Sequence, residues 1–133
     1  MGQMSSAANT ASRSRTTSEP GQRPEDWDLP AIARYLNENL GPKLTAHLVG
    51  KDPQTVARWV KGQQKPPQDE VERKLRGAFQ IFSLLVQTDS RHVVRAWFIG
   101  MNPQLEDRSP ADVIADGDTR AAMVAARAFV TGG

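Results

Sequence analysis

Four polar side chains fall on one face of a predicted helix, and their types are those that read nucleic acid. They are Gln54, Thr55, Arg58 and Lys61. Glutamine pairs bidentately with adenine and arginine with guanine, threonine bonds a base edge, and lysine suits a phosphate. Lys51 adds a positive charge just before this helix. The pattern predicts a DNA-contacting face made by these five residues.

The segment Leu44–Gly62 has the spacing of a helix-turn-helix that would present this face. Ala46 is small enough to face a partner helix, and Gly50 comes four residues later, where a sharp turn with positive φ is needed. Val56 and Trp59 form an i, i+3 apolar pair that would press the second helix onto the first. An Asp-Pro pair starts this second helix and a glycine ends it. An ordinary helical hairpin with a solvated outer face is the alternative.

Local charge favours the nucleic-acid interpretation. The whole chain carries a formal charge of only +2. Basic residues nevertheless outnumber acidic ones in the hairpin and the helix after it, which is the electrostatic footprint of a DNA-binding unit. The basic residues are Lys43, Lys51, Arg58, Lys61, Lys65, Arg73, Lys74 and Arg76, and the acidic residues are Asp52, Asp69, Glu70 and Glu72.

Composition argues against an enzyme and against a metal or cofactor site. The chain has no cysteine and only two histidines, His47 and His92, which lie far apart in sequence. Asp112, Asp116 and Asp118 resemble an acidic cluster, but two of them are better explained as helix caps or first-turn residues, and EF-hand spacing is missing. No apolar run approaches a membrane span and no signal-peptide core is visible, so we expect a cytoplasmic protein.

The 133 residues, 38% of them hydrophobic, suffice for one modest core or two very small ones. We expect an all-α fold with a disordered arm over 1–26, a helix-turn-helix unit over 27–76 and a compact helical unit over 77–133. The two units would share a long helix, divided near Gly77. Three arginines of the arm could touch DNA, although a solvated tail is favoured. They are Arg13, Arg15 and Arg23.

Capping residues predict where the remaining helices begin and end. Asp28 would cap a first helix that stops at Gly41, and the long helix would start near Gln68 or Asp69. A helix over 91–99 would bury one side. That side comprises Val93, Val94, Trp97 and Phe98. A loop held to the core by Leu105 should precede a short helix that begins at Ser109. A last helix should begin at Asp118 or Thr119. One side of this last helix would comprise Ala122, Met123, Ala126 and Phe129 or Val130.

The stretch 97–117, WFIGMNPQLEDRSPADVIADG, followed by an alanine-rich helix, resembles the C-terminal toxin-binding domain of Xre/MbcA/ParS-type antitoxins. The ordered chain, 28–130, also fits that family's layout of a helix-turn-helix followed by this domain. At one position the chain departs from the pattern: Met101 stands where the family often has proline, and Pro103 follows instead. The resemblance is carried by Trp97, Asn102, Leu105, Arg108, Pro110, Asp112, Asp116 and Gly117.

The resemblance implies an antitoxin of a type II system. It would neutralise a RES-domain, NAD-consuming toxin by obstructing its active site with the C-terminal end, and would repress its own operon by binding an operator. On this chain the toxin-binding residues would be Arg127, Phe129 and Val130. We expect a homodimer or a hetero-oligomer with the toxin. The alternative is a stand-alone repressor of a phage or mobile element, whose C-terminal unit serves only dimerisation.

Overall fold

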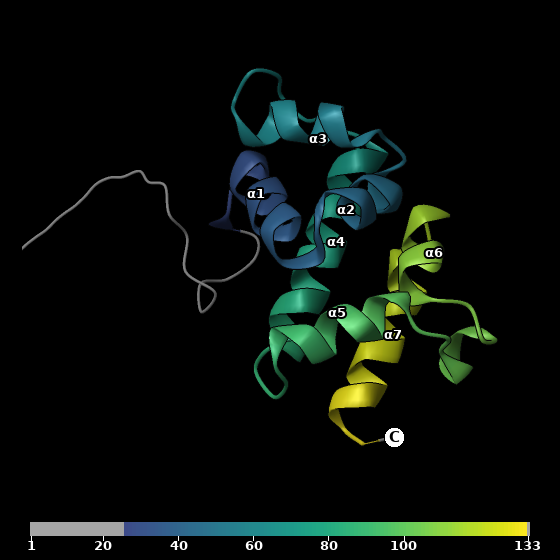
Figure 1. Ribbon diagram of the computed structural model, residues 1–133. Coiled ribbons are helices and arrows are strands. Elements are labelled where there is room, and N and C mark those ends of the chain that lie inside the picture. Colours follow the sequence, from purple (N-terminus) through teal and green to yellow (C-terminus); the bar gives the residue numbers. More distant parts are fainter. Residues whose placement is uncertain (1–25, 133) are drawn as a thin grey trace, which may run out of the picture.

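The computed structural model describes residues 26–132, and within them the chain is all-α (Figure 1). Seven α-helices and one 3₁₀ turn are present, and the only strand-like feature of this part is an isolated bridge between Asn102 and Arg108. The α-helices are α1 (Leu29–Leu40), α2 (Pro42–Val49), α3 (Pro53–Val60), α4 (Glu70–Leu85), α5 (Arg91–Ile99), α6 (Pro110–Ala115) and α7 (Thr119–Val130). The 3₁₀ turn is η2 (Pro103–Leu105).

Side-chain caps start the helices where the sequence predicts them. A carboxylate oxygen of Asp28 accepts a hydrogen bond from the Ala31 N–H at 2.8 Å, which satisfies one of the free donors of α1. Asp69 and Ser109 do the same for α4 and α6. Asp118 caps α7. These predicted boundaries are therefore confirmed.

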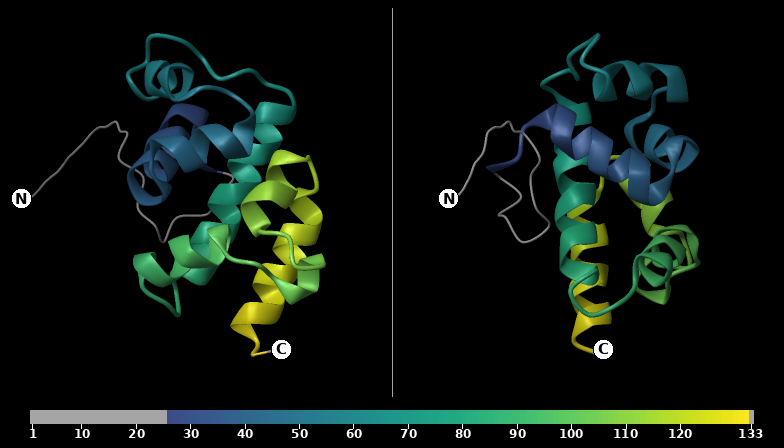
Figure 2. Two further views of the ribbon diagram at one scale, coloured as in Figure 1. Left: turned by 45° about the vertical axis from the view of Figure 1, so that its right-hand side comes forward. Right: turned by 60° about the vertical axis from the view of Figure 1, so that its left-hand side comes forward.

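Helix α4 is the centre of the fold. It packs against α1 and α2 on one side and against α6 and α7 on another, and Figure 2 shows α7 running beside it. Phe79 and Phe82 of α4 are fully buried, and the ring of Tyr35 on α1 meets both edge-on, with centroids 5.2 and 5.5 Å apart. Such pairs add to the burial of apolar area. Most of the apolar second half of α4 is thus buried inside the chain.

Two contacts set how closely α4 meets the C-terminal helices. Gly77 lies so close to α7 that a Cβ there would be 3.1 Å from the side chain of Thr119. Lys74 is buried, and its ammonium donates to the carbonyl of Ala115, at the end of α6, at 2.8 Å. Lys74, which the sequence placed in the positive surface excess, therefore satisfies a helix C-terminus instead.

The prediction for α5 is correct in its bounds and partly wrong in its buried side. Val94 and Phe98 are fully buried, as expected, but Val93 is 43% exposed and Trp97 is half-buried. The physical reason is that α5 packs chiefly against α6 and α1, which cover a stripe of only one residue per turn. Val93 and Ile99 are left at the surface, and Trp97 packs partly against the core.

Some expectations lie beyond what this structure tests. The arm over 1–26, with Arg13, Arg15 and Arg23, lies outside the described residues apart from Asp26. A division of the chain near Gly77 stays a prediction, and the buried apolar side chains of all the described α-helices belong to one cluster. Among residues 26–132, no helix has the length and apolar character needed to cross a membrane.

We expect Trp59→Ala to lower the free energy of unfolding by about 3–5 kcal/mol, because it empties a fully buried site in the core of α1–α3. Trp97→Ala should cost less, since that ring is only half-buried. Urea melts followed by circular dichroism measure both, with Val93→Ala as an exposed control. Equal losses for Trp59→Ala and Val93→Ala would contradict the assignment of Trp59 to the core.

Candidate nucleic-acid interface and C-terminal groove

The turn between α2 and α3 has the predicted geometry. Gly50 ends α2 in the left-handed conformation with φ of 70°, which a side chain would strain. Asp52 then caps α3, and its carboxylate accepts from the Thr55 N–H at 2.8 Å. Ala46 is buried against the neighbouring helices, and Val56 and Trp59 are fully buried. This part of the sequence prediction is confirmed.

The five candidate DNA-contacting residues lie together on the outer side of α3 and its preceding turn. Gln54, Arg58 and Lys61 are exposed on or just after α3, and Lys51 is exposed in the turn. Thr55 is half-buried at the start of α3. A convex helix with amide and guanidinium groups on its outer side has the shape and chemistry that a major groove accepts.

Thr55 has a second role that the sequence did not reveal. The pKa of the Asp52 carboxyl is lowered, first by the hydrogen bond from the Thr55 N–H and next by the Thr55 hydroxyl. The Thr55 N–H therefore takes part in the cap that starts α3. Nearby Arg58 also favours the charged carboxylate.

The unpaired positive charge gathers on α3 rather than on α4. Among the described residues, no carboxylate forms an ion pair with Lys51, Arg58 or Lys61. Every basic residue of α4, by contrast, has an acidic neighbour. The pairs are Arg73 with Glu70, Lys74 with Glu70, and Arg76 with Glu72. Because each α4 cation has a carboxylate neighbour, the exposed cations of this half of the chain without an ion pair lie outside α4, and three of them are on α3 or directly beside it.

Asn102 organises the loop between α5 and α6. Its side-chain oxygen accepts from the Gln104 N–H at 2.9 Å, and its carbonyl accepts from the N–H groups of Leu105 and Asp107, both at 2.9 Å. Its own N–H donates to the Arg108 carbonyl at 3.2 Å. Leu105 is buried, as predicted. The loop therefore has a defined conformation around one asparagine.

This conformation includes two residues with positive φ. Glu106 and Asp107 have φ of 57° and 67°, in the left-handed region that costs a residue with a side chain of the order of 1 kcal/mol. The hydrogen bonds of Asn102 offset this cost. Met101, which replaces the proline expected from the resemblance, is 81% exposed, while Pro103 begins η2.

A polar network ties this motif to the helix-turn-helix. The Arg108 guanidinium pairs with the Asp116 carboxylate at the end of α6. Asp112, whose N–H donates to the Ser109 hydroxyl, is hydrogen-bonded through its carboxylate to His47 Nε2 of α2 at 2.7 Å. The hydrogen bond from His47 is the largest cause of the lowered pKa of Asp112. The sequence analysis gave His47 no role, because 65 positions separate it from its partner.

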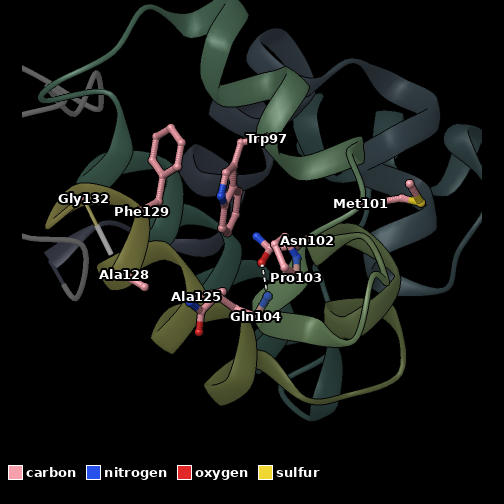
Figure 3. Close-up of a pocket in the computed structure, with 9 residues that line it drawn as sticks. All are labelled: Trp97, Met101, Asn102, Pro103, Gln104, Ala125, Ala128, Phe129 and Gly132. Carbon is pink, nitrogen blue, oxygen red and sulfur yellow. Dashed lines mark hydrogen bonds between the residues drawn. The ribbon is translucent and has the colours of Figure 1, made fainter.

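A groove of about 500 Å³ lies between the loop after α5 and the end of α7 (Figure 3). Trp97 and Phe129 form its apolar wall, with ring centroids 6.4 Å apart, and Asn102 lies beside Trp97. None of the nine described residues that line it is charged. The remaining lining residues are Met101, Pro103, Gln104, Ala125, Ala128 and Gly132.

The three candidate toxin-binding residues differ in exposure. Arg127 is exposed and Phe129 is 43% exposed, whereas Val130 is half-buried against the core. Phe129 lines the groove, and Arg127 faces α4 across a separate hollow. In Figures 1 and 2 the C-terminal end of α7 and helix α3 lie at opposite ends of the molecule. Within residues 26–132, no three His, Asp or Glu side chains come together as a metal site would require.

Comparison with known proteins relates the chain to one kind of protein. No protein-family model matches it. It is 29% identical over 85 residues to the mycobacterial cidal antitoxin MbcA of Mycobacterium tuberculosis and of Mycobacterium bovis, a match that covers 64% of this chain and 74% of MbcA. The fold matches a chain in the crystal structure of the M. tuberculosis MbcT-MbcA toxin-antitoxin complex with a TM-score of 0.66 and 27% identity, over 78% of this chain and 95% of that one.

The link between Asp112 and His47 should make stability depend on pH at the acid end. Because the pKa of Asp112 is lowered from 3.8 in the folded state, its contribution is present above that value and is lost as the pH falls through the folded pKa. Asp112→Asn should therefore reduce stability near neutral pH, by at most about 1 kcal/mol for so exposed a pair. The loss should vanish at a pH well below 3.8.

Urea unfolding of the wild-type and variant proteins at the two pH values measures this difference. Glu38→Gln, an exposed substitution on α1, is the control for loss of a surface carboxylate. A difference between wild type and Asp112→Asn that persists unchanged at acid pH would show that the carboxylate charge is not what holds α6 to α2.

Proposed function

We propose that this chain, a distant homologue of the MbcA antitoxins, is the antitoxin of a toxin-antitoxin system and binds a RES-type, NAD-consuming toxin. One observation carries the proposal. The fold of the chain matches nearly the full length of a chain in the MbcT-MbcA complex, so the likeness is not limited to the widespread helix-turn-helix. The motif around Asn102, which is specific in order and spacing, supports it.

The C-terminal end is the part that we assign to neutralisation. Arg127 and Phe129 are exposed on the last turns of α7, close to the chain end. Phenylalanine and arginine are both residue types that the centres of interfaces favour, and Arg127 forms no ion pair among the described residues. Val130 is half-buried against the core and supports the helix end more than it contacts a partner. By inserting this end into the toxin's cofactor cleft, the chain would exclude substrate.

A second function, repression of the chain's own operon, is supported by a separate observation. Lys51, Arg58 and Lys61 are exposed cations that form no ion pair among the described residues, and Gln54 lies on the same side. A helix that presents unpaired cations with a base-reading amide fits an operator better than it fits a passive solvated surface. Paired half-sites on the operator would require two copies of the chain.

The operator proposal is tested by two substitutions with different signatures. Arg58→Ala should weaken binding to a specific operator by about 1–3 kcal/mol, because it removes a base contact. Lys61→Ala should weaken binding to every sequence and lower the slope of log K against log salt by about one unit. Gel-shift titrations at several salt concentrations give both quantities. Unchanged affinity and slope for both variants would exclude α3 as the reading helix.

The neutralisation proposal predicts that the two activities separate along the chain. Deleting Ala128–Gly133 should abolish inhibition of the toxin's NAD consumption while operator binding is retained, because α3 lies at the far end of the molecule. Phe129→Ala should give a smaller loss without a change in folding, since the ring is 43% exposed. Val124→Ala, at an exposed position of the same helix, is the matched control.

Inhibition, operator affinity and melting temperature must be measured on the same preparations. If toxin inhibition, operator binding and stability all fall together in the truncated protein, the C-terminal turn serves the core. The blocking mechanism would then be wrong.

A further inference from the structure

The groove at the end of α7 combines an apolar wall with a hydrogen-bond donor that has no acceptor. Asn102 is only 8% exposed, and its side-chain oxygen is used by the Gln104 N–H. Its side-chain nitrogen has no hydrogen-bond partner among the described residues. Figure 3 shows this nitrogen turned away from Gln104 and toward Trp97, into the groove.

The groove wall adds a second donor of the same kind. The indole Nε1–H of Trp97 is shielded from solvent and has no acceptor among residues 26–132. Figure 3 shows it on the side of the ring that faces Phe129. A shielded donor without a partner costs about 1–3 kcal/mol relative to one that is hydrogen-bonded. This cost applies to the Trp97 indole. The Asn102 amide nitrogen is not shielded in the same way, and it gains a fixed partner if an oxygen atom with a lone pair enters the groove.

We propose that the groove receives an extended segment of the toxin, with an apolar side chain against Trp97 and Phe129 and a backbone carbonyl that accepts from the Asn102 amide. The proposal rests on the proposed antitoxin function and names the surface that the toxin uses. The groove is complementary to a carbonyl because the Asn102 N–H donor faces it and none of its nine described lining residues is charged. A carbonyl satisfies such donors, whereas a cation or a carboxylate would be desolvated without a counter-charge.

The size and position of the groove agree with this occupant. About 500 Å³ accommodates one or two side chains with their backbone, less than a helix would need. Met101 forms an exposed apolar rim, and Phe129 connects the groove to the C-terminal turn that we assign to neutralisation. The toxin would therefore be held from two directions, by the end of α7 entering the toxin and by a toxin segment entering the groove.

Asn102→Asp is the decisive variant. It keeps an oxygen for the Gln104 N–H, so the loop retains its cap, but it replaces the donor that faces the groove by an oxygen that repels a carbonyl. Met101→Glu places a charge on the exposed rim, where folding is not at risk. Gln68→Glu adds the same charge at an exposed position before α4 and is the matched control.

Binding to a cognate RES-type toxin, measured by calorimetry, should weaken about tenfold or more for Asn102→Asp and Met101→Glu and stay unchanged for Gln68→Glu. In ¹⁵N spectra of the wild-type chain with unlabelled toxin, the Trp97 indole and Asn102 amide signals should move downfield and exchange more slowly. The indole signals of Trp27 and Trp59, whose rings lie in the core, are internal references and should not move.

Each result decides something different. Tight wild-type binding with equal affinity for both groove variants overturns the groove proposal and leaves the antitoxin function standing, whereas no wild-type binding overturns both. If Asn102→Asp lowers the melting temperature, the groove proposal is tested by Met101→Glu and by the spectrum of the wild-type chain. Trp97 and Asn102 signals that do not move when toxin is added would overturn the proposal. Self-association of the free chain that Met101→Glu abolishes would assign the groove to a second copy instead.

Discussion

The burial of α4 is the constraint on which the other elements depend. A helix that is apolar around much of its circumference has to be covered on several sides, and here α1, α2, α6 and α7 share that cover. Phe79 and Phe82 meet the ring of Tyr35 from the N-terminal helices, and Gly77 lets α7 approach on another side. The helix-turn-helix and the C-terminal motif therefore have fixed positions relative to each other.

The loop at Asn102 shows how a short motif can be specific without a long sequence pattern. One asparagine supplies three acceptor contacts and one donor contact to the backbone, and these hold two residues with positive φ. A residue without a side-chain acceptor at this position would leave the Gln104 N–H without its partner, whereas the other three contacts use the backbone of Asn102. The spacing of Asn102, Leu105, Arg108 and Pro110 is thus explained by the geometry of the turn, in addition to any contact with a partner.

The sequence predicted those parts of the fold that depend on neighbouring residues. The caps at Asp28, Asp52, Ser109 and Asp118, and the buried pair in α3, follow from local spacing and are confirmed. Contacts that depend on how the helices pack could not be predicted from the sequence. They include Lys74 with Ala115, His47 with Asp112, and the groove beside Trp97.

The exposed fraction of α5 illustrates the same limit. Apolar periodicity identified a helix that buries one side, but only the packing of neighbouring helices decides how wide that side is. For the same reason the candidate DNA-contacting residues could be predicted as a set on one side of α3, whereas the ion pairs of the α4 cations within their own helix were not predicted.

The separation of α3 from the end of α7 has a consequence for assemblies on DNA. If both proposed interfaces are used, the bound toxin projects away from the double helix, so its bulk does not compete with the phosphates for space. Copies of the chain on adjacent half-sites, about 34–36 Å apart, would carry their toxins at a similar spacing. Toxin subunits that associate with each other would then tether both copies to one operator and raise the effective concentration of each half-complex for its own site.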